Sequence, residues 1–132
     1  MIKVTDSKLF LDSCIWLGYF LGNIPETKKL IESEETILFT SIISVHEVFK
    51  KLRKLGKTEK ESIKAIEYIE ENGIVITLNK KIVLFAAESC KKYRLHTIDS
   101  LIYSSAMETN ATFVTVDKDF RKTPNTKMID TR

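Results

Sequence analysis

Short apolar runs of strand length alternate with segments of helical periodicity along the chain, and this alternation constrains the fold more than any other feature. The runs at residues 9–11, 37–40, 74–78 and 112–116 are rich in leucine, aromatic and β-branched residues. A further short edge strand is expected at residues 127–129. Strands that alternate with helices predict an α/β/α sandwich around a central parallel sheet of about four to five strands.

The segments between these runs have the apolar spacing of amphipathic helices. In one of them Ile63, Ile66 and Ile69 recur at helical spacing and are expected to point inward. Gly22 and Gly56 follow periodic segments and predict helix ends. The predicted helices cover residues 14–20, 25–35, 45–55, 58–72, 82–93 and 98–108.

Length and composition are those of one folded domain, which we expect to cover residues 1–132. The chain is 43% hydrophobic and 30% charged, without the loss of apolar residues that marks disorder. Its cysteines, Cys14 and Cys90, lack zinc-site spacing and predict a reducing, cytoplasmic environment. No apolar run approaches the roughly 20 residues that a membrane span needs, so no membrane association is expected.

The net charge of +3 is too small to indicate nucleic-acid binding, so the distribution of basic residues must decide. Arg121 and Lys122 come shortly after an acidic segment and are candidates for contact with the phosphates of a nucleic acid. A longer basic stretch, between residues 50 and 60, is interpreted as the solvated face of a helix. It consists of Lys50, Lys51, Arg53, Lys54, Lys57 and Lys60.

Acidic residues recur where the strand-like runs meet helix starts. Asp12 and Asp117 follow predicted strands directly, and Glu47 and Asp99 lie in the first turns of predicted helices. In a parallel sheet these positions converge on the crevice at the carboxyl edge, where open α/β sheets bind ligands. Carboxylate oxygens suit a hard cation, so the pattern predicts a Mg²⁺ or Mn²⁺ site.

Each acid also has an alternative explanation as a helix cap. Asp12 and Asp117 could cap the turns that follow their strands. Ser44 and Glu47 fit the capping-box pattern S-x-x-E, and a helix dipole favours Asp99 in a first turn. The joint placement of the four acids, together with the sequence around them, favours a functional set.

That surrounding sequence resembles the motifs of PIN-domain ribonucleases. The matching segments are FLDS at residues 10–13, SVHEV at 44–48, IDSLI at 98–102 and FVTVDKDF at 113–120. The last is the most specific, because a hydrophobic strand that runs into T-x-D-x-D-F is a recurrent ending of the family. The resemblance extends from Leu9 to about Ile129, and the length matches the compact toxins of VapBC-type toxin-antitoxin pairs.

The resemblance implies a Mg²⁺- or Mn²⁺-dependent endoribonuclease with a PIN-like fold. It also implies an RNA substrate, a cognate antitoxin that inserts a segment into the acidic groove, and a homodimer. Carried over by position, the site consists of Asp12, Glu47, Asp99 and Asp117 as metal-binding, catalytic acids, Ser13 and Thr115 as hydroxyls that hydrogen-bond a carboxylate or a water at the metal, and Asp119 as a secondary acid.

Other interpretations remain open at this stage. An RNA-processing PIN nuclease, or an inactive PIN scaffold that binds RNA or protein, would carry the same motifs. A signalling receiver domain is disfavoured, because it needs paired acids after its first strand and an acceptor Asp after its third. Here the first strand ends in Asp12 alone, and Asn79 follows the third.

Overall fold

A computed structural model describes residues 7–131. Its centre is a five-stranded sheet in which all neighbouring strands are parallel, in the order β3-β2-β1-β4-β5. This confirms the predicted α/β/α sandwich. The strands are β1 Lys8–Leu11, β2 Ile37–Ser41, β3 Ile74–Ile76, β4 Thr112–Thr115 and β5 Thr126–Met128.

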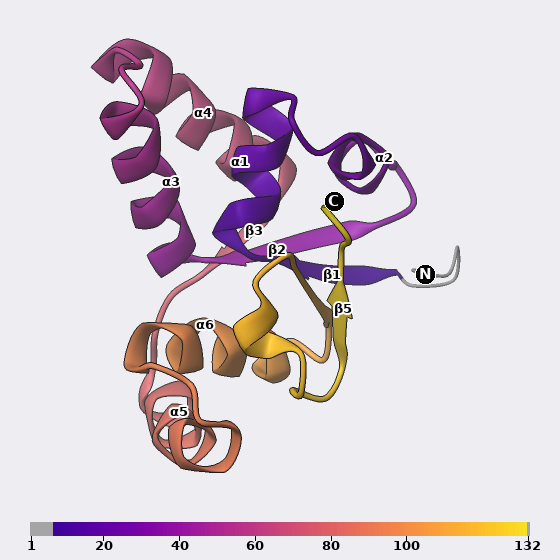
Figure 1. Cartoon of the computed structure of the whole chain (residues 1–132), viewed down its shortest axis with the longest axis vertical. Helices are drawn as coiled ribbons and strands as arrows, with labels where there is room; N and C mark the ends of the chain where they lie inside the picture. Colours follow the sequence, from indigo (N-terminus) through magenta and orange to yellow (C-terminus); the bar gives the residue numbers. More distant parts are fainter. Residues whose placement is uncertain (1–6, 132) are drawn as a thin grey trace.

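The helices form a layer on each face of the sheet (Figure 1). The first four lie on one face, and α6 lies on the other with α5 packed outside it. A short 3-10 helix, η1, follows β4. The helices are α1 Ser13–Leu21, α2 Glu26–Ile31, α3 Ile42–Lys54, α4 Glu59–Asn72, α5 Lys80–Tyr93 and α6 Thr97–Glu108, and η1 is Lys118–Phe120.

Two hydrophobic cores follow from the alternation of side chains along the central strands. Leu9 and Leu11 of β1 point into the core beneath α1, α3 and α4, while Phe10 points into the core beneath α6. Phe113 and Val114 of β4 divide in the same way. The central strands are therefore buried on both faces, which explains their continuous apolar runs.

Several predicted details of the helices are wrong. Ser44 and Glu47 do not form a capping box, because α3 begins at Ile42 and the Ser41 hydroxyl caps it by accepting from the Ile43 N–H. The capping box is found at the start of α4 instead. Ile63, expected to be buried, is 43% exposed, because the apolar face of α4 is buried more deeply toward the C-terminal end of the helix, at Ile69.

The order of the strands creates a switch point between β1 and β4. The chain first adds β2 and β3 on one side of β1, and then crosses to the other face of the sheet before adding β4 and β5. Connections thus leave the carboxyl ends of β1 and β4 toward opposite faces, which opens a crevice between them. Asp12 and Asp117 follow these two strands.

Among the described residues, no helix is long and apolar enough to cross a membrane.

Candidate metal centre

Asp12 is fixed at the junction of β1 and α1. Its backbone N–H extends the pairing with β4 by donating to the Val114 carbonyl at 3.0 Å. Its Oδ1 accepts from the Ser13 backbone N–H at 2.8 Å, so the side chain caps α1. Its Oδ2 accepts from the Thr115 hydroxyl at 2.7 Å. Asp12 is only 6% exposed, and its carboxylate is oriented by the start of α1 and the end of β4.

Thr115, the last residue of β4, connects Asp12 to the loop that carries the next acids. Its hydroxyl donates to Asp12 and accepts from the Asp117 backbone N–H at 3.0 Å. The Cys14 thiol lies 3.6 Å from Asp12 Oδ2 and 3.5 Å from Thr115 Oγ1, and it accepts from the Val116 N–H at 3.4 Å. Sequence analysis missed this contact of Cys14, because the partners are remote in sequence.

Three further carboxylates form a cluster at the same edge of the sheet. Asp99 lies in the first turn of α6, while Asp117 and Asp119 flank the start of η1. Each offers an oxygen, and the three oxygens lie within 4.8 Å of one another. The turn is held by the Asp119 N–H, which donates to Asp117 Oδ1 at 2.9 Å. These carboxylates are near enough to share one ion.

Glu47 lies in the second turn of α3, and its half-buried side chain borders both groups of acids. Its charge contributes to raising the pKa of Asp12 and of Asp99. Glu47 is thus electrostatically coupled to the acid on β1 and to the acid on α6, across the crevice. Of the four acids that the sequence singled out, the structure places Asp99 and Asp117 in one cluster with Asp119, whereas Glu47 and Asp12 lie outside that cluster.

Burial and mutual repulsion raise two of the carboxyl pKa values. Desolvation raises the pKa of Asp12 to about 6, although its hydrogen bonds with Thr115 and Ser13 oppose the shift. Desolvation also raises the pKa of Asp99 to about 6, followed by repulsion from Asp117, Asp119 and Glu47. Ionised carboxylates at this edge therefore lack sufficient neutralising charge.

No basic side chain supplies that charge within the part of the chain that the structure describes. Between residues 7 and 131, no lysine or arginine nitrogen lies within 4.0 Å of these carboxylates; the Lys81–Glu108 ion pair lies elsewhere. His96 lowers the pKa of Asp99 only as the last of its causes. A cluster of oxygen donors without a protein counter-ion fits a hard divalent cation such as Mg²⁺ or Mn²⁺.

The other predicted site residues lie around this cluster. Ser13 binds Asp12 through its backbone N–H. Among the described contacts, none between the Ser13 hydroxyl and Asp12 is found. Arg121 and Lys122 are exposed just after η1, and the Arg121 guanidinium donates to the Lys118 carbonyl at 3.0 Å. Asn110, which precedes β4 at the opposite end of that strand, has φ 55° and so lies in the left-handed region.

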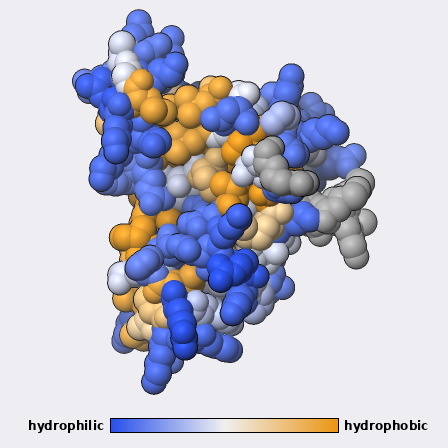
Figure 2. Space-filling view, in the orientation of Figure 1, coloured by the Kyte–Doolittle hydropathy of each residue, from blue (hydrophilic) through white to orange (hydrophobic). Residues whose placement is uncertain are grey.

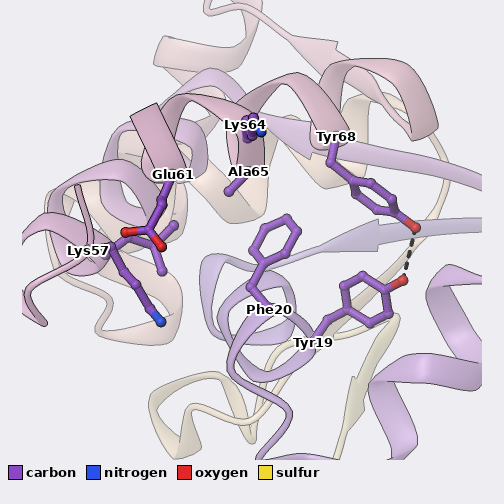
Figure 3. Close-up of a pocket in the computed structure, with 8 residues that line it drawn as sticks. Tyr19, Phe20, Lys57, Glu61, Lys64, Ala65 and Tyr68 are labelled. Atoms are coloured by element: carbon purple, nitrogen blue, oxygen red, sulfur yellow. Dashed lines mark hydrogen bonds between the residues drawn. The ribbon is translucent and has the colours of Figure 1, made fainter. Parts of the chain in front are cut away.

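A second concavity lies at the far end of α1, away from the acids. This pocket, of about 350 Å³, is lined by aromatic residues of α1 and α4 and by charged residues of the α3–α4 turn and α4. In Figure 3 the Tyr19 and Tyr68 rings approach each other, and their hydroxyls are 3.0 Å apart. Phe20 packs edge-on against Tyr68. Trp16, by contrast, is fully buried in the core.

A parallel α/β sandwich with a carboxylate cluster at a switch point defines a class of fold with a candidate divalent-metal centre. Comparison with known families identifies the member of that class. The PIN domain model matches residues 9–125, and the chain belongs to the PIN-domain family. The resemblance found in the sequence is thereby confirmed. No curated protein sequence matches the chain.

Solved structures with the same fold include several toxin-antitoxin proteins. A toxin-antitoxin complex from Klebsiella pneumoniae has a TM-score of 0.76 and 23% identity, over 92% of this chain and 97% of that one. VapBC2 from Rickettsia felis, bound to a promoter DNA fragment, has a TM-score of 0.77 and 19% identity, over 93% and 99%. Mycobacterium tuberculosis VapC20, a sarcin-ricin loop cleaving toxin, has a TM-score of 0.72 and 15% identity, over 88% and 95%.

Proposed function

We propose that the protein is a Mg²⁺- or Mn²⁺-dependent endoribonuclease that acts as the toxin of a VapBC-type pair. The observation that carries the proposal is the cluster of Asp99, Asp117 and Asp119 at the carboxyl edge of a PIN-domain sheet. The donor set contains only oxygen ligands, which matches the metals that serve phosphodiester hydrolysis.

In this proposal Asp99, Asp117 and Asp119 hold the ion, and Glu47 and Asp12 complete the acidic set. A bound divalent ion supplies neutralisation of phosphate charge, activation of water and stabilisation of the leaving oxygen. The chain supplies the positions of the ligands: η1 fixes Asp117 against Asp119, and Thr115 fixes Asp12.

The toxin role is supported by the fold comparisons, in which PIN proteins of similar length occur in complexes with antitoxins. We propose a cognate antitoxin that covers the acidic groove, and the aromatic pocket of α1 and α4 offers apolar surface for its docking. Cleavage of cellular RNA by such a toxin would take place in the cytoplasm.

A homodimer is the second assembly that we propose. Its support is apolar surface on α5, where the consecutive residues Val83, Leu84 and Phe85 are 45%, 57% and 45% exposed. Large apolar residues exposed within one turn of a helix are typical of a surface that a partner covers. Light scattering of the purified protein, compared with a Leu84→Glu variant, measures the expected change from dimer to monomer.

The proposed activity is tested by incubating the protein with a panel of structured RNAs, with Mn²⁺ or with a chelator. We expect cleavage that requires the metal and that Asp99→Asn abolishes. Glu88→Gln, an exposed acid on α5, is the matched control and should cleave like the wild type. Both variants remove one negative charge, so the comparison separates the site from a general charge effect.

Cleavage that persists in Asp99→Asn, after removal of contaminating nucleases, would contradict the assignment. RNA binding without cleavage by the wild type would instead indicate a PIN scaffold that has lost its activity.

A further inference from the structure

Helix α3 extends away from the acidic site, and one face of it carries Glu47 and then lysines. Residues three, four and seven positions apart lie on the same face of a helix. Counted from Glu47, these positions are occupied by Lys50, Lys51 and Lys54. Because the Glu47 carboxylate interacts with Asp12 and Asp99, this face begins at the crevice.

Packing of the opposite face fixes the orientation of this stripe. Val48 and Leu52 are buried in the core under α3, with 0% and 3% exposure. The side chains of Lys50, Lys51 and Lys54 are consequently exposed. In the space-filling view, the outer side of the molecule around α3 is hydrophilic (Figure 2).

The charge of the stripe is not neutralised by acids of α3. From Val48 to Lys54 the helix contains no acidic residue, and none of its described lysines has a carboxylate within 4.0 Å. On the following helix, the Glu61 carboxylate accepts from the Thr58 N–H at 2.8 Å and so belongs to the cap of α4. A row of three positive charges therefore adjoins a cluster of negative ones.

We infer that this row, Lys50, Lys51 and Lys54, is a binding track for the RNA phosphates next to the bond that is cleaved. The inference rests on the proposed function and names where that substrate lies. A polyanion could place one phosphate at the cation-holding acids and neighbouring phosphates on the lysines. The row extends about 10 Å from Glu47 at 1.5 Å per residue, so it reaches beyond a single phosphate.

The track is tested by RNA binding, which needs no cleavage. Anisotropy of a labelled single-stranded RNA is measured at several salt concentrations in an Asp99→Asn background. Neutralising the row with K50Q/K51Q/K54Q should lower the slope of log affinity against log salt by about 2, because each lost phosphate contact in a single strand contributes about 0.7. Affinity at low salt should fall at least tenfold.

The matched control is K28Q/K29Q/K91Q, which removes three exposed charges from α2 and α5. Its slope should equal that of the parent. Equal slopes in the track and control variants would overturn the inference. In the wild-type background the track variant should raise KM for a long RNA and leave kcat within about twofold, whereas a lowered kcat with unchanged KM would also contradict the track.

The two proposals can fail separately. If the wild type cleaves no RNA but the track variant alone loses salt-dependent binding, the nuclease assignment fails and the lysine row stands as an RNA-binding surface only. If metal-dependent cleavage is found and both lysine variants bind RNA equally, the track fails and the nuclease stands.

Discussion

The two halves of the acidic site are held in different ways. Asp12 is almost fully buried, and its two oxygens accept hydrogen bonds from the start of α1 and from the end of β4. Asp99 and Asp117 are half-buried and Asp119 is exposed, and their oxygens face one another. Hydrogen bonds from the protein hold Asp12 in place. The cluster of Asp99, Asp117 and Asp119 is instead held together although its carboxylates repel one another.

This difference suggests a division of labour. Carboxylates that repel one another in the open gain most from a cation, while a carboxylate already satisfied by hydrogen bonds gains less. We therefore expect the cluster to determine metal affinity and Asp12 to determine the geometry of the reaction. The following changes test that division.

The largest effect is expected on metal affinity. Asp99→Asn should weaken Mn²⁺ binding more than the roughly 10- to 100-fold that loss of an outer partner of a metal site costs, because it removes a ligand of the cluster. Asp12→Asn should weaken binding less than about tenfold by the same scale. Calorimetric titration of both variants measures the difference. Equal losses would mean that the two halves bind the ion as one unit.

A smaller effect is expected from breaking the link between the halves. Thr115→Val leaves Asp12 Oδ2 and the Asp117 N–H without their buried partner, so the free energy of unfolding should fall by about 1–3 kcal/mol. Urea denaturation and cleavage rates are compared with Thr27→Val, which removes a buried hydroxyl on α2 that donates to the Ile24 carbonyl. Both variants should lose stability, but only Thr115→Val should lose cleavage. Normal cleavage by Thr115→Val would remove Thr115 from the site.

A third effect is expected on the pH dependence of the metal-free protein. The pKa values of Asp12 and Asp99 rise from 3.8 to about 6 on folding, so between these values the folded chain binds more protons than the unfolded chain. Their contribution to the free energy of unfolding should therefore decrease as the pH rises from about 4 to about 6, and then level off. Denaturation with a chelator, for the wild type and Asp99→Asn, measures this slope.

Asp99→Asn should show a shallower decrease, because one of the two groups is gone. If the free energy of unfolding has the same pH slope in both proteins, repulsion within the cluster does not lower the stability of the folded protein.

Much of the fold could be predicted from local sequence. The apolar runs of β1, β2 and β4 are buried on both faces, so their patterns are strong. β3 is less buried and ends at Ile76 rather than at residue 78. The start of α3 was missed because Ser41, the last residue of a strand, also caps the helix, and the S-x-x-E pattern three residues later is stronger in sequence.

The site could be predicted only as a set of residues. Position after a strand indicates that Asp12 and Asp117 meet at one edge, but the order of the strands decides which acids touch. The resemblance implies Asp119 only as a secondary acid; the structure places one of its carboxylate oxygens within 4.8 Å of one of Asp99 through the turn of η1. The sequence does not show which face of α3 is buried, and only the burial of Val48 and Leu52 places its lysines on the outer face.

The central place of β1 in the sheet has a consequence for synthesis. Thr115, which orients Asp12, follows it by 103 residues, and Asp117 and Asp119 come later still. A chain that is still being translated thus presents Asp12 and Glu47 long before their counterparts exist. If the protein degrades RNA, cleavage therefore requires synthesis at least as far as Asp119.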